Sequence, residues 1–350
     1  MMKKIYKNII DCNIGDILAA DVINDRGVVL VANNTIINEY IKNKLFEIGI
    51  SQVCILDYEK IDNLDIERTI RYENVKRDYR ENILSVKKVL NDISFGKGLD
   101  FKKLKEISKT IYTSAGEIGN IIKCLNEVRD FDEYTYSHCV NVSFYSMLIA
   151  KWLELPEKKV LNAVYAGLLH DVGKMKISDE IINKKESLTK KDFEEIKKHT
   201  IYGYDIVNEI EGLDIGVKRA ALLHHEREDS TGYPLGIQGN EINLYSKIVA
   251  VADVYDAMTS DRVYKKRETP FDVFEMFLTI GISSFDSTVL RVFLNNIAAY
   301  YVDANIALDN GKVGKIVYIP PHDITSPIIS VDSEYIDFSK DNRYRMLGLI

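Results

Sequence analysis

The sequence predicts a mainly α-helical protein, with a helical bundle in the middle of the chain and a small β-containing module at each end. Apolar residues recur at helical spacing through about residues 116–308, as in the segment LNAVYAGLLHD that begins at Leu161. Short β-type runs broken by Gly, Pro and Asp occur instead before residue 57 and after residue 308. The 350 residues, 46% of them hydrophobic, suffice for two or three domains with buried cores.

The elements follow one another in four segments. Residues 1–57 predict a β-containing module, in which ILAADVIND, the turn Asp25-Arg26-Gly27 and VVLVA are typical of a hairpin and the strand-like QVCIL follows an amphipathic segment. Residues 58–115 place apolar residues at helical intervals among many charges, which indicates a connecting helix suited to a homodimer contact. Residues 116–308 form the bundle. Residues 309–350 form the C-terminal module, with strands expected in GKVGKIVYIPP, SPIISVD and YIDFS.

Charge and hydropathy exclude several classes of protein. The formal net charge of −7 gives no basic footprint for duplex nucleic acid, so a phosphate ligand needs local positive charge. No apolar stretch approaches the roughly 20 residues that span a bilayer, and the first residues lack the apolar core of a signal peptide. We therefore expect a cytoplasmic protein.

The four cysteines, Cys12, Cys54, Cys124 and Cys139, lack CxxC spacing, so we expect reduced, buried thiols.

The histidines are the most informative residues. Five of the six lie in the helical region and only His322 lies outside it; the five are His138, His170, His199, His224 and His225. A single histidine on an apolar helix face is more often a hydrogen-bonded core residue than a ligand. Five of them, together with Asp171 and Asp253 in apolar runs, would be costly to bury unless a cation compensates the carboxylates. The cluster therefore predicts a metal site.

The number of candidate ligands indicates more than one ion. Seven ligands exceed what one ion needs, and imidazole with carboxylate is the ligand set expected for Fe, Mn or Zn. Two-metal centres with a bridging carboxylate typically perform in-line displacement at phosphorus, and Asp171 is our candidate bridge.

Ordered motifs carry a resemblance to a known family. The stretches YTYSHCVNV, AGLLHDVGKMKISDEII, LTKKDFEEIKKHTIYG, HHEREDSTGYPLGIQG and VADVYDAMTSDRVYKK resemble, in that order, an HD-GYP domain of the HD phosphohydrolase superfamily. The resemblance covers about residues 116–300. It implies an HD-type all-α domain with a di- or trinuclear iron or manganese centre that hydrolyses cyclic di-GMP to pGpG or GMP. The implied metal ligands are His138, His170, Asp171, His199, His224, His225 and Asp253.

The resemblance also implies residues that act on the substrate. Lys174 matches the family's catalytic lysine, which would stabilise charge on the phosphoryl group. Tyr233, Arg262 and Lys265 match positions that hold the dinucleotide. The alternatives are a solvated lysine, a turn tyrosine and an arginine paired with Asp256 or Asp261. Glu226 and Asp229 are either partners that orient the histidines or surface charges.

The chain departs from the family pattern at several positions. Tyr134 stands four residues before His138, where trinuclear members carry a glutamate, so we expect two ions, Fe or Mn, and no third. Ser230 replaces the usual glycine, which predicts an altered turn in the loop around the ligand. The other departures are Lys185-Glu186 in place of Pro-Gly and Val263 in place of Pro.

Three functional hypotheses follow. The first is a phosphodiesterase that hydrolyses cyclic di-GMP with a hydroxide activated by two metals. The second is a cyclic-dinucleotide receptor that signals through its flanking modules, which could bind a protein partner. The third is an HD-type hydrolase of another nucleotide, such as cyclic GMP-AMP or a dNTP. Turnover measured across these ligands distinguishes the three.

Overall fold

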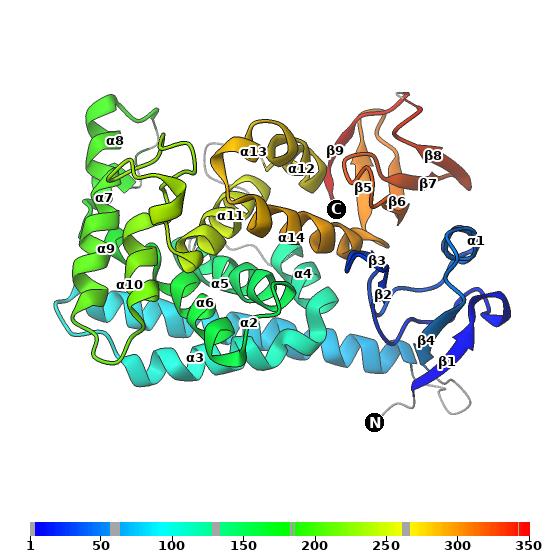
Figure 1. The fold of residues 1–350 in the computed structure, drawn as a ribbon, viewed down its shortest axis with the longest axis horizontal. Coiled ribbons are helices and arrows are strands. Elements are labelled where there is room, and N and C mark those ends of the chain that lie inside the picture. The colour runs from blue at the N-terminus through cyan, green and yellow to red at the C-terminus, as the bar shows by residue number, and fades with distance from the viewer. Residues whose placement is uncertain are drawn as a thin grey trace.

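The computed structural model describes residues 4–56, 64–127, 134–182, 184, 186–260, 267–341 and 343–350. As predicted, the described chain is mainly α-helical, with β-strands gathered near its two ends. The bundle lies on one side of the molecule and both β modules lie on the other (Figure 1). None of the described helices combines the length and apolar character that crossing a membrane requires.

The bundle core consists of five helices that pack against one another. Helices α5 and α6 form its centre, α11 packs on both of them, α10 packs against α6 and α11, and α9 packs against α10. Apolar residues are buried on nearly every side of α5, including Val142, Tyr145 and Ile149. The helices are α5 (Tyr134–Trp152), α6 (Glu157–Leu169), α9 (His199–Asn208), α10 (Ile215–Leu223) and α11 (Leu244–Thr259).

The predicted connecting segment, residues 58–115, forms two helices along the bundle, α2 (Leu64–Ser94) and α3 (Phe101–Thr113), and α4 (Ile118–Glu127) follows it and also packs on α2. Helix α2 runs past the bundle toward the N-terminal module (Figure 1). Its apolar stripe, which includes Tyr79, Val86 and Leu90, is buried, and the helix packs against α5 of the same chain. The stripe is thus used within one chain, and the homodimer contact stays a prediction.

Further helices pack around this five-helix core. These are α7 (Asp179–Ile182), α8 (Lys190–Lys197), α12 (Pro270–Thr279), α13 (Gly281–Ser284) and α14 (Ser287–Ile297), with the 3-10 turns η4 (Val172–Lys176) and η6 (Ala298–Tyr301). Capping boxes at Thr189 and Thr269 start α8 and α12, since each threonine accepts from the N3 backbone N–H and an aspartate at N3 reaches back.

The N-terminal module contains the predicted hairpin. Strand β2 (Val22–Ile23) pairs antiparallel with β3 (Val29–Val31) around the Asp25-Arg26-Gly27 turn, where Gly27 adopts a φ of 75°. Helix α1 (Glu39–Glu47) corresponds to the amphipathic segment, and QVCIL forms β4 (Gln52–Leu56). Strand β4 pairs antiparallel with β1 (Lys4–Asn8), a strand that the sequence did not predict.

The C-terminal module is a five-stranded sheet in the order β8-β7-β6-β5-β9, with antiparallel neighbours. The three predicted runs form β6 (Val313–Tyr318), β7 (Ile328–Val331) and β8 (Glu334–Asp337). The sheet also includes β5 (Asn305–Leu308) and β9 (Met346–Leu349). Because β5 precedes the predicted boundary at residue 309, the module begins earlier than we expected.

The two β modules contact each other and the end of the bundle. The Tyr40 ring of α1 lies 5.6 Å from the Tyr318 ring and 5.7 Å from the Tyr335 ring, centroid to centroid. The Tyr300 hydroxyl of η6 donates to the Asp21 carboxylate at 3.0 Å. Segments from opposite ends of the chain therefore close against η6, next to the start of the C-terminal sheet.

Candidate metal centre

The predicted ligands come from the ends and the middles of the core helices. His138 lies inside α5 and Asp253 inside α11, whereas the other ligands sit where helices begin or end. His170 caps the C-terminus of α6, Asp171 precedes η4, His199 begins α9 and His224 caps α10. A helix end lets a side chain turn inward without displacing apolar residues of the same helix, so the bundle brings five segments to one point.

Two glycines allow the backbones near these ligands to approach closely. A Cβ on Gly167 would lie 2.5 Å from the Ser143 Cα of α5, so α6 meets α5 only without a side chain there. A Cβ on Gly173 would lie 1.9 Å from the His199 carbonyl oxygen. These contacts bring the His170-Asp171 pair close to α5 and α9, and they explain the two glycines of AGLLHDVGK.

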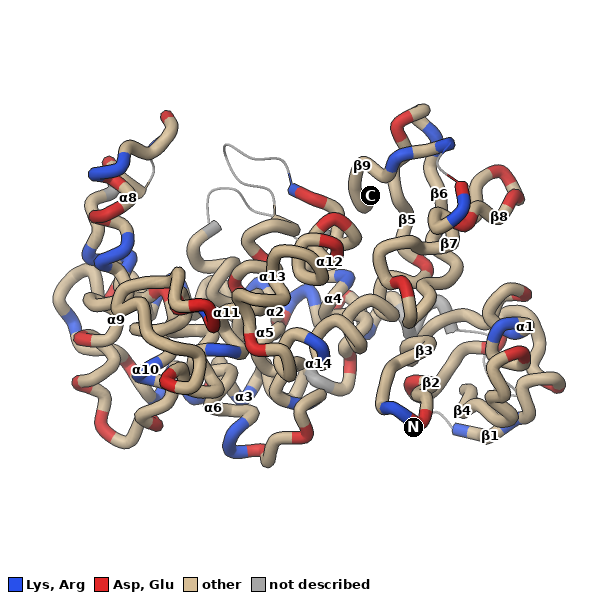
Figure 2. The backbone as a smooth tube through the Cα atoms, turned by 45° about the horizontal axis from the view of Figure 1, so that its top comes forward, with Lys and Arg blue, Asp and Glu red and all other residues tan. Residues whose placement is uncertain are grey.

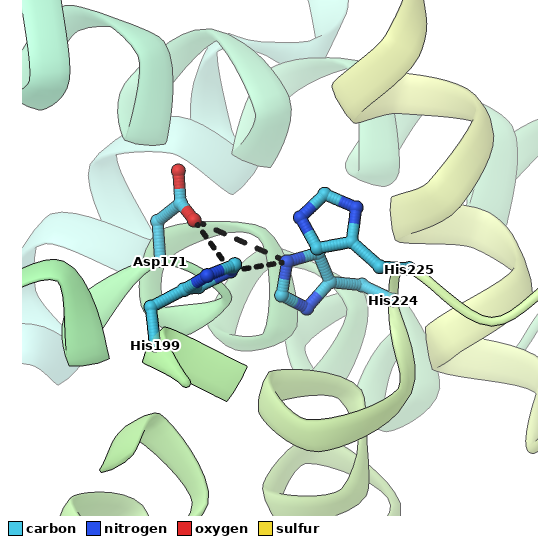
Figure 3. Close-up of side chains that lie close together, drawn as sticks. All are labelled: Asp171, His199, His224 and His225. Atoms are coloured by element: carbon cyan, nitrogen blue, oxygen red, sulfur yellow. Dashed lines mark hydrogen bonds and ion pairs between the residues drawn. The ribbon is translucent and has the colours of Figure 1, made fainter. Parts of the chain in front are cut away.

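The ligand atoms form two groups that share Asp171. One group contains Asp171, His199, His224 and His225, and the other contains His138, His170 and Asp171; the ligand atoms of each group lie within 4.8 Å of one another. In Figure 3 the Asp171 carboxylate and the three rings of the first group point toward one another. His199 Nε2 lies 3.3 Å from Asp171 Oδ1, and His138 Nε2 lies 3.7 Å from Asp171 Oδ2.

Backbone carbonyls orient three of the rings. His170 Nδ1 lies 2.8 Å from the Gly167 oxygen, His199 Nδ1 2.7 Å from the Ile196 oxygen and His224 Nδ1 3.0 Å from the Ala220 oxygen. Because a carbonyl only accepts, each Nδ1 must carry the proton and donate it. Each ring then faces the cluster with Nε2, which is how metal-ligating histidines are commonly held.

Two buried atoms in the centre fit a metal ion. Among the described residues, His170 Nε2 and Asp171 Oδ1 are buried and have no hydrogen-bond partner. Both residues are almost inaccessible to solvent. Unpaired buried polar atoms cost free energy, which coordination to a cation would offset. The donor set of imidazole nitrogens and carboxylate oxygens is also the chemistry that Fe, Mn and Zn accept.

Two aspartates of α11 flank His138 on either side of its ring. His138 Nε2 lies 3.0 Å from Asp253 Oδ1, and Nδ1 lies 2.7 Å from Asp256 Oδ2. Burial lowers the pKa of His138, but the hydrogen bonds to both carboxylates outweigh it and raise the pKa to about 9. The sequence had suggested Asp256 only as a partner for Arg262. The signal available in the sequence was that Asp256 lies three residues after Asp253 on one helix, which places both carboxylates on the same helix face.

Three further histidines and Asp171 have the protonation states that metal binding needs. Burial lowers the pKa of His225 to about 3 and also lowers the pKa values of His199 and His224. Burial opposes ionisation of Asp171, yet the nearby His170 and Lys174 hold its pKa well below its usual range. Near neutral pH these rings are neutral and the carboxylate is ionised, so a cation finds ready ligands.

Lys174 contacts the shared carboxylate directly. Its ammonium group pairs with Asp171 Oδ2, and 28% of its side chain is exposed, so the group borders both the cluster and solvent. Burial lowers the pKa of Lys174, but the Asp171 charge raises it above its usual value overall. Lys174 is therefore a cation held at the edge of the metal cluster, unlike the solvated lysine that we had weighed.

The loop that carries Tyr233 packs on the adjacent histidines. The Tyr233 ring stacks on His225, with centroids 4.6 Å apart, and its backbone N–H donates to the His225 carbonyl at 3.2 Å. A Cβ on Gly232 would lie 2.5 Å from that same carbonyl oxygen. The loop thus needs glycine at 232 to bring Tyr233 against a metal-ligand candidate.

Glu226 and Asp229 hold this loop. The buried Glu226 carboxylate accepts from the backbone N–H groups of Leu235, Gly236 and Ile237 at 2.7, 3.1 and 3.3 Å. The Asp229 carboxylate accepts from Thr231 and from the Ser284 hydroxyl. In the described structure both carboxylates thus bind the loop, whereas we had considered them as partners of the histidine rings or surface charges. Ser230 keeps the turn in the left-handed region, with a φ of 62°.

Some predicted positions cannot be compared with the structure. Arg262, Val263 and Lys265 lie outside the described residues, as does Lys185, and the side chain of Tyr134 is likewise not described. All four cysteines are buried, which agrees with our expectation, and burial raises the pKa of the Cys139 thiol.

A helical bundle that gathers histidines and aspartates from separate helices around one adjacent His-Asp pair defines a metal-binding domain of the HD type. The comparisons with known proteins agree, because residues 125–289 match the family described as HD domain. A solved protein of Bdellovibrio bacteriovorus, described as an HDG"Y"P protein, shares the fold with a TM-score of 0.51 and 14% identity, over 83% of this chain and 98% of that one.

Curated proteins that are similar to this chain are named as cyclic-dinucleotide phosphodiesterases. The chain is 33% identical to a cyclic di-GMP phosphodiesterase of Pseudomonas aeruginosa, over 71% of this chain and 59% of the relative. It is 36% identical to a cyclic di-GMP phosphodiesterase of Thermotoga maritima, over 51% of this chain and 48% of that relative. It is 34% identical to a 3'3'-cGAMP-specific phosphodiesterase of Vibrio cholerae, over 38% of this chain and 28% of that relative. The chain thus spans from about a quarter to three fifths of these relatives. It is an HD-GYP domain protein.

Proposed function

We propose that this chain is a metal-dependent phosphodiesterase that hydrolyses cyclic di-GMP to pGpG, GMP or both. The observation that carries the proposal is the position of Asp171, which belongs to both candidate ligand groups. Such an arrangement suits two divalent ions bridged by one carboxylate, and we propose Fe or Mn for both. The names of the relatives from Pseudomonas aeruginosa and Thermotoga maritima support the substrate.

The ligands divide between the two proposed ions around Asp171. His199, His224 and His225 would hold one ion together with Asp171, and His138 and His170 would hold the other together with the same aspartate. Asp253 lies 3.0 Å from His138 Nε2 and 3.8 Å from His225 Nδ1, between the two groups. It is therefore a candidate ligand of either ion.

Two divalent ions, when bound, supply an activated water and offset negative charge at phosphorus. The residues of the chain do the rest. Lys174 places a permanent cation beside Asp171, where it can donate to a phosphoryl oxygen as charge develops there. Tyr233 offers a ring already fixed against His225 beside the cluster, which suits contact with the dinucleotide. We propose that Arg262 and Lys265 supply further positive charge to the phosphates.

A second candidate substrate is 3'3'-cGAMP. It is favoured by the relative of Vibrio cholerae that is named as specific for this dinucleotide. The two substrates share the ring of phosphodiesters and differ in one base, so the same metal centre serves both and base contacts decide between them.

The test uses purified full-length chain loaded without oxygen with Mn(II) or Fe(II). We expect cyclic di-GMP to be opened to a linear product, at a rate that Asp171→Ala and Lys174→Met each reduce at least about a hundredfold. Running 3'3'-cGAMP in parallel ranks the two substrates by kcat/KM. If the loaded protein binds cyclic di-GMP and leaves both substrates intact, the receptor hypothesis replaces the enzymatic one.

A further inference from the structure

A chain of buried hydrogen bonds joins helix α2 to the metal-ligand candidate His138. The Tyr79 hydroxyl of α2 donates to Asn141 Oδ1 of α5 at 2.7 Å. Asn141 Nδ2 donates in turn to Asp256 Oδ1 of α11 at 2.8 Å. Asp256 Oδ2 lies 2.7 Å from His138 Nδ1. Four residues on three helices thus form one path that ends on the ring.

Every member of this path is shielded from water. Tyr79, Asp256 and His138 are each 2% exposed and Asn141 is 5% exposed. In such surroundings hydrogen bonds are electrostatically strong and polarise one another. The Asp256 oxygen accepts from the Asn141 amide nitrogen, so the amide oxygen faces Tyr79 and accepts from the tyrosine hydroxyl. The amide then fixes one oxygen of the carboxylate, and the other oxygen faces His138.

A purely structural role would be to tie α2 to α5, but another pair already does this. The Tyr136 hydroxyl of α5 donates to Asn91 Oδ1 of α2 at 2.8 Å, so it links the same two helices. This bond ends on Asn91 of α2 and not on a residue that contacts a candidate metal ligand. Tyr79 differs because its bond leads inward to a carboxylate that contacts a ligand.

We infer that Tyr79 and Asn141 are positioning residues for His138, which hold Asp256 so that the ring presents Nε2 to the metal. The inference rests on the metal centre proposed above. Tyr79 lies outside residues 125–289, which match the HD domain, and belongs to the helix that leads from the N-terminal module. The connecting segment thus contributes to the metal site, and a shift of α2 along the bundle would change metal affinity.

The experiment measures Mn(II) affinity of the full chain by competition with a chromophoric chelator. Tyr79→Phe removes one hydroxyl and keeps the ring, and we expect it to weaken Mn(II) binding about threefold to tenfold. Tyr136→Phe removes the matched tyrosine bond between the same helices, and we expect Mn(II) affinity within about twofold of the unaltered chain. Thermal unfolding of both variants checks that they lose similar stability.

A double-mutant cycle tests the path itself. In an Asn141→Ala background, Tyr79→Phe should cause no further loss of Mn(II) affinity, because its effect travels through that amide. Asp256→Asn provides a second background that keeps the side-chain shape, and there too the tyrosine change should have no added effect. Equal losses from Tyr79→Phe in all backgrounds would overturn the proposed path.

The outcomes separate this inference from the proposed function. If Tyr79→Phe and Tyr136→Phe bind Mn(II) equally well, the inference fails while hydrolysis by the unaltered chain is unaffected. If the unaltered chain binds Mn(II) but hydrolyses neither dinucleotide, the proposed activity fails. The Mn(II) affinities of Tyr79→Phe and Tyr136→Phe, each relative to the unaltered chain, still decide the inference. A chain that binds no Mn(II) or Fe(II) would overturn both.

Discussion

Asp171 connects the two candidate ligand groups, and this position makes the number of ions testable at one residue. We expect about two ions per loaded chain, about one after His225→Ala and fewer than one after Asp171→Ala, because only the aspartate serves both groups. Metal analysis after gel filtration measures the ratio. If Asp171→Ala retained the same metal content as His225→Ala, Asp171 would not be the bridge.

The protonation of His138 predicts how metal binding depends on pH. With a pKa of about 9, the ring carries a proton at neutral pH that a metal ion must displace. Mn(II) affinity should therefore rise with pH between 7 and 9, by up to about tenfold per unit, and level off above that. His225, with a pKa of about 3, adds no proton in this range.

Competition titrations at several pH values check this dependence, and Asp256→Asn provides the control. That variant removes one of the carboxylates that raise the His138 pKa, so the rise in affinity should shift to lower pH. An affinity that stays constant from pH 7 to pH 9 would contradict the protonated ring.

Ser230 predicts a gain in stability on substitution. Its φ of 62° lies in the left-handed region, which is unfavourable for a residue with a Cβ and open to glycine. Ser230→Gly should raise the free energy of unfolding by about 0.5 to 1 kcal/mol, measured by chemical denaturation. Ser51→Gly, at an exposed position outside that region, should lower it by about 0.5 kcal/mol. Equal effects of both changes would refute the argument.

At the scale of elements, the contact between η4 and α9 sets the geometry of the first ligand group. Gly173→Ala would place a methyl group 1.9 Å from the His199 carbonyl, so the two segments must separate. We expect a loss of about 3 kcal/mol in the free energy of unfolding and weaker metal binding. Gly116→Ala, where no atom lies within 4 Å of the added Cβ, is the matched control. Similar stability of the two variants would show that the segments tolerate separation.

The elements also show what sequence reasoning could reach. Local patterns predicted the β2–β3 hairpin, α6 and the strands β6, β7 and β8, because turn residues and periodicity act over a few positions. Strands β1 and β9 were missed because each pairs only with a segment distant in the sequence, as when Leu349 of β9 faces Ile306 of β5. Strand β5 was also missed, although it pairs with the adjacent β6 as well as with β9. Their short runs carry little signal of their own.

The candidate site also contains residues that could be predicted from the sequence and one that could not. The seven candidate ligands could be picked out because ordered motifs and apolar surroundings mark them, and the structure brings their side chains close together, while their role as ligands stays a prediction. Figure 2 shows why charge alone could not do so: basic and acidic residues alternate along the surface helix α8 as well, where Lys197 and Lys198 pair with nearby glutamates. Tyr79 could not be predicted, since it lies 62 positions from Asn141 and only the packing of α2 brings them together.

At the scale of the whole molecule, Tyr40 joins the two β modules. Its ring contacts Tyr318 and Tyr335 of the C-terminal sheet, so Tyr40→Ala should weaken the contact by about 2 kcal/mol. Amide hydrogen exchange in β6 should then accelerate, while exchange in α5 stays slow. Tyr6→Ala is the control, since that ring is 78% exposed. Equal exchange in β6 for both variants would mean that the modules do not depend on this contact.

The four buried cysteines have a consequence for how the protein responds to air. All of them lie in the described structure, away from solvent, and burial raises the thiol pKa values of Cys12 and Cys139. Thiols in this state react slowly with oxidants, because the thiolate is the reactive form. If the iron-loaded protein loses activity in oxygen, the loss should therefore reflect oxidation of Fe(II). Ascorbate and fresh ferrous iron should restore it, and a thiol reagent should leave the native protein unlabelled.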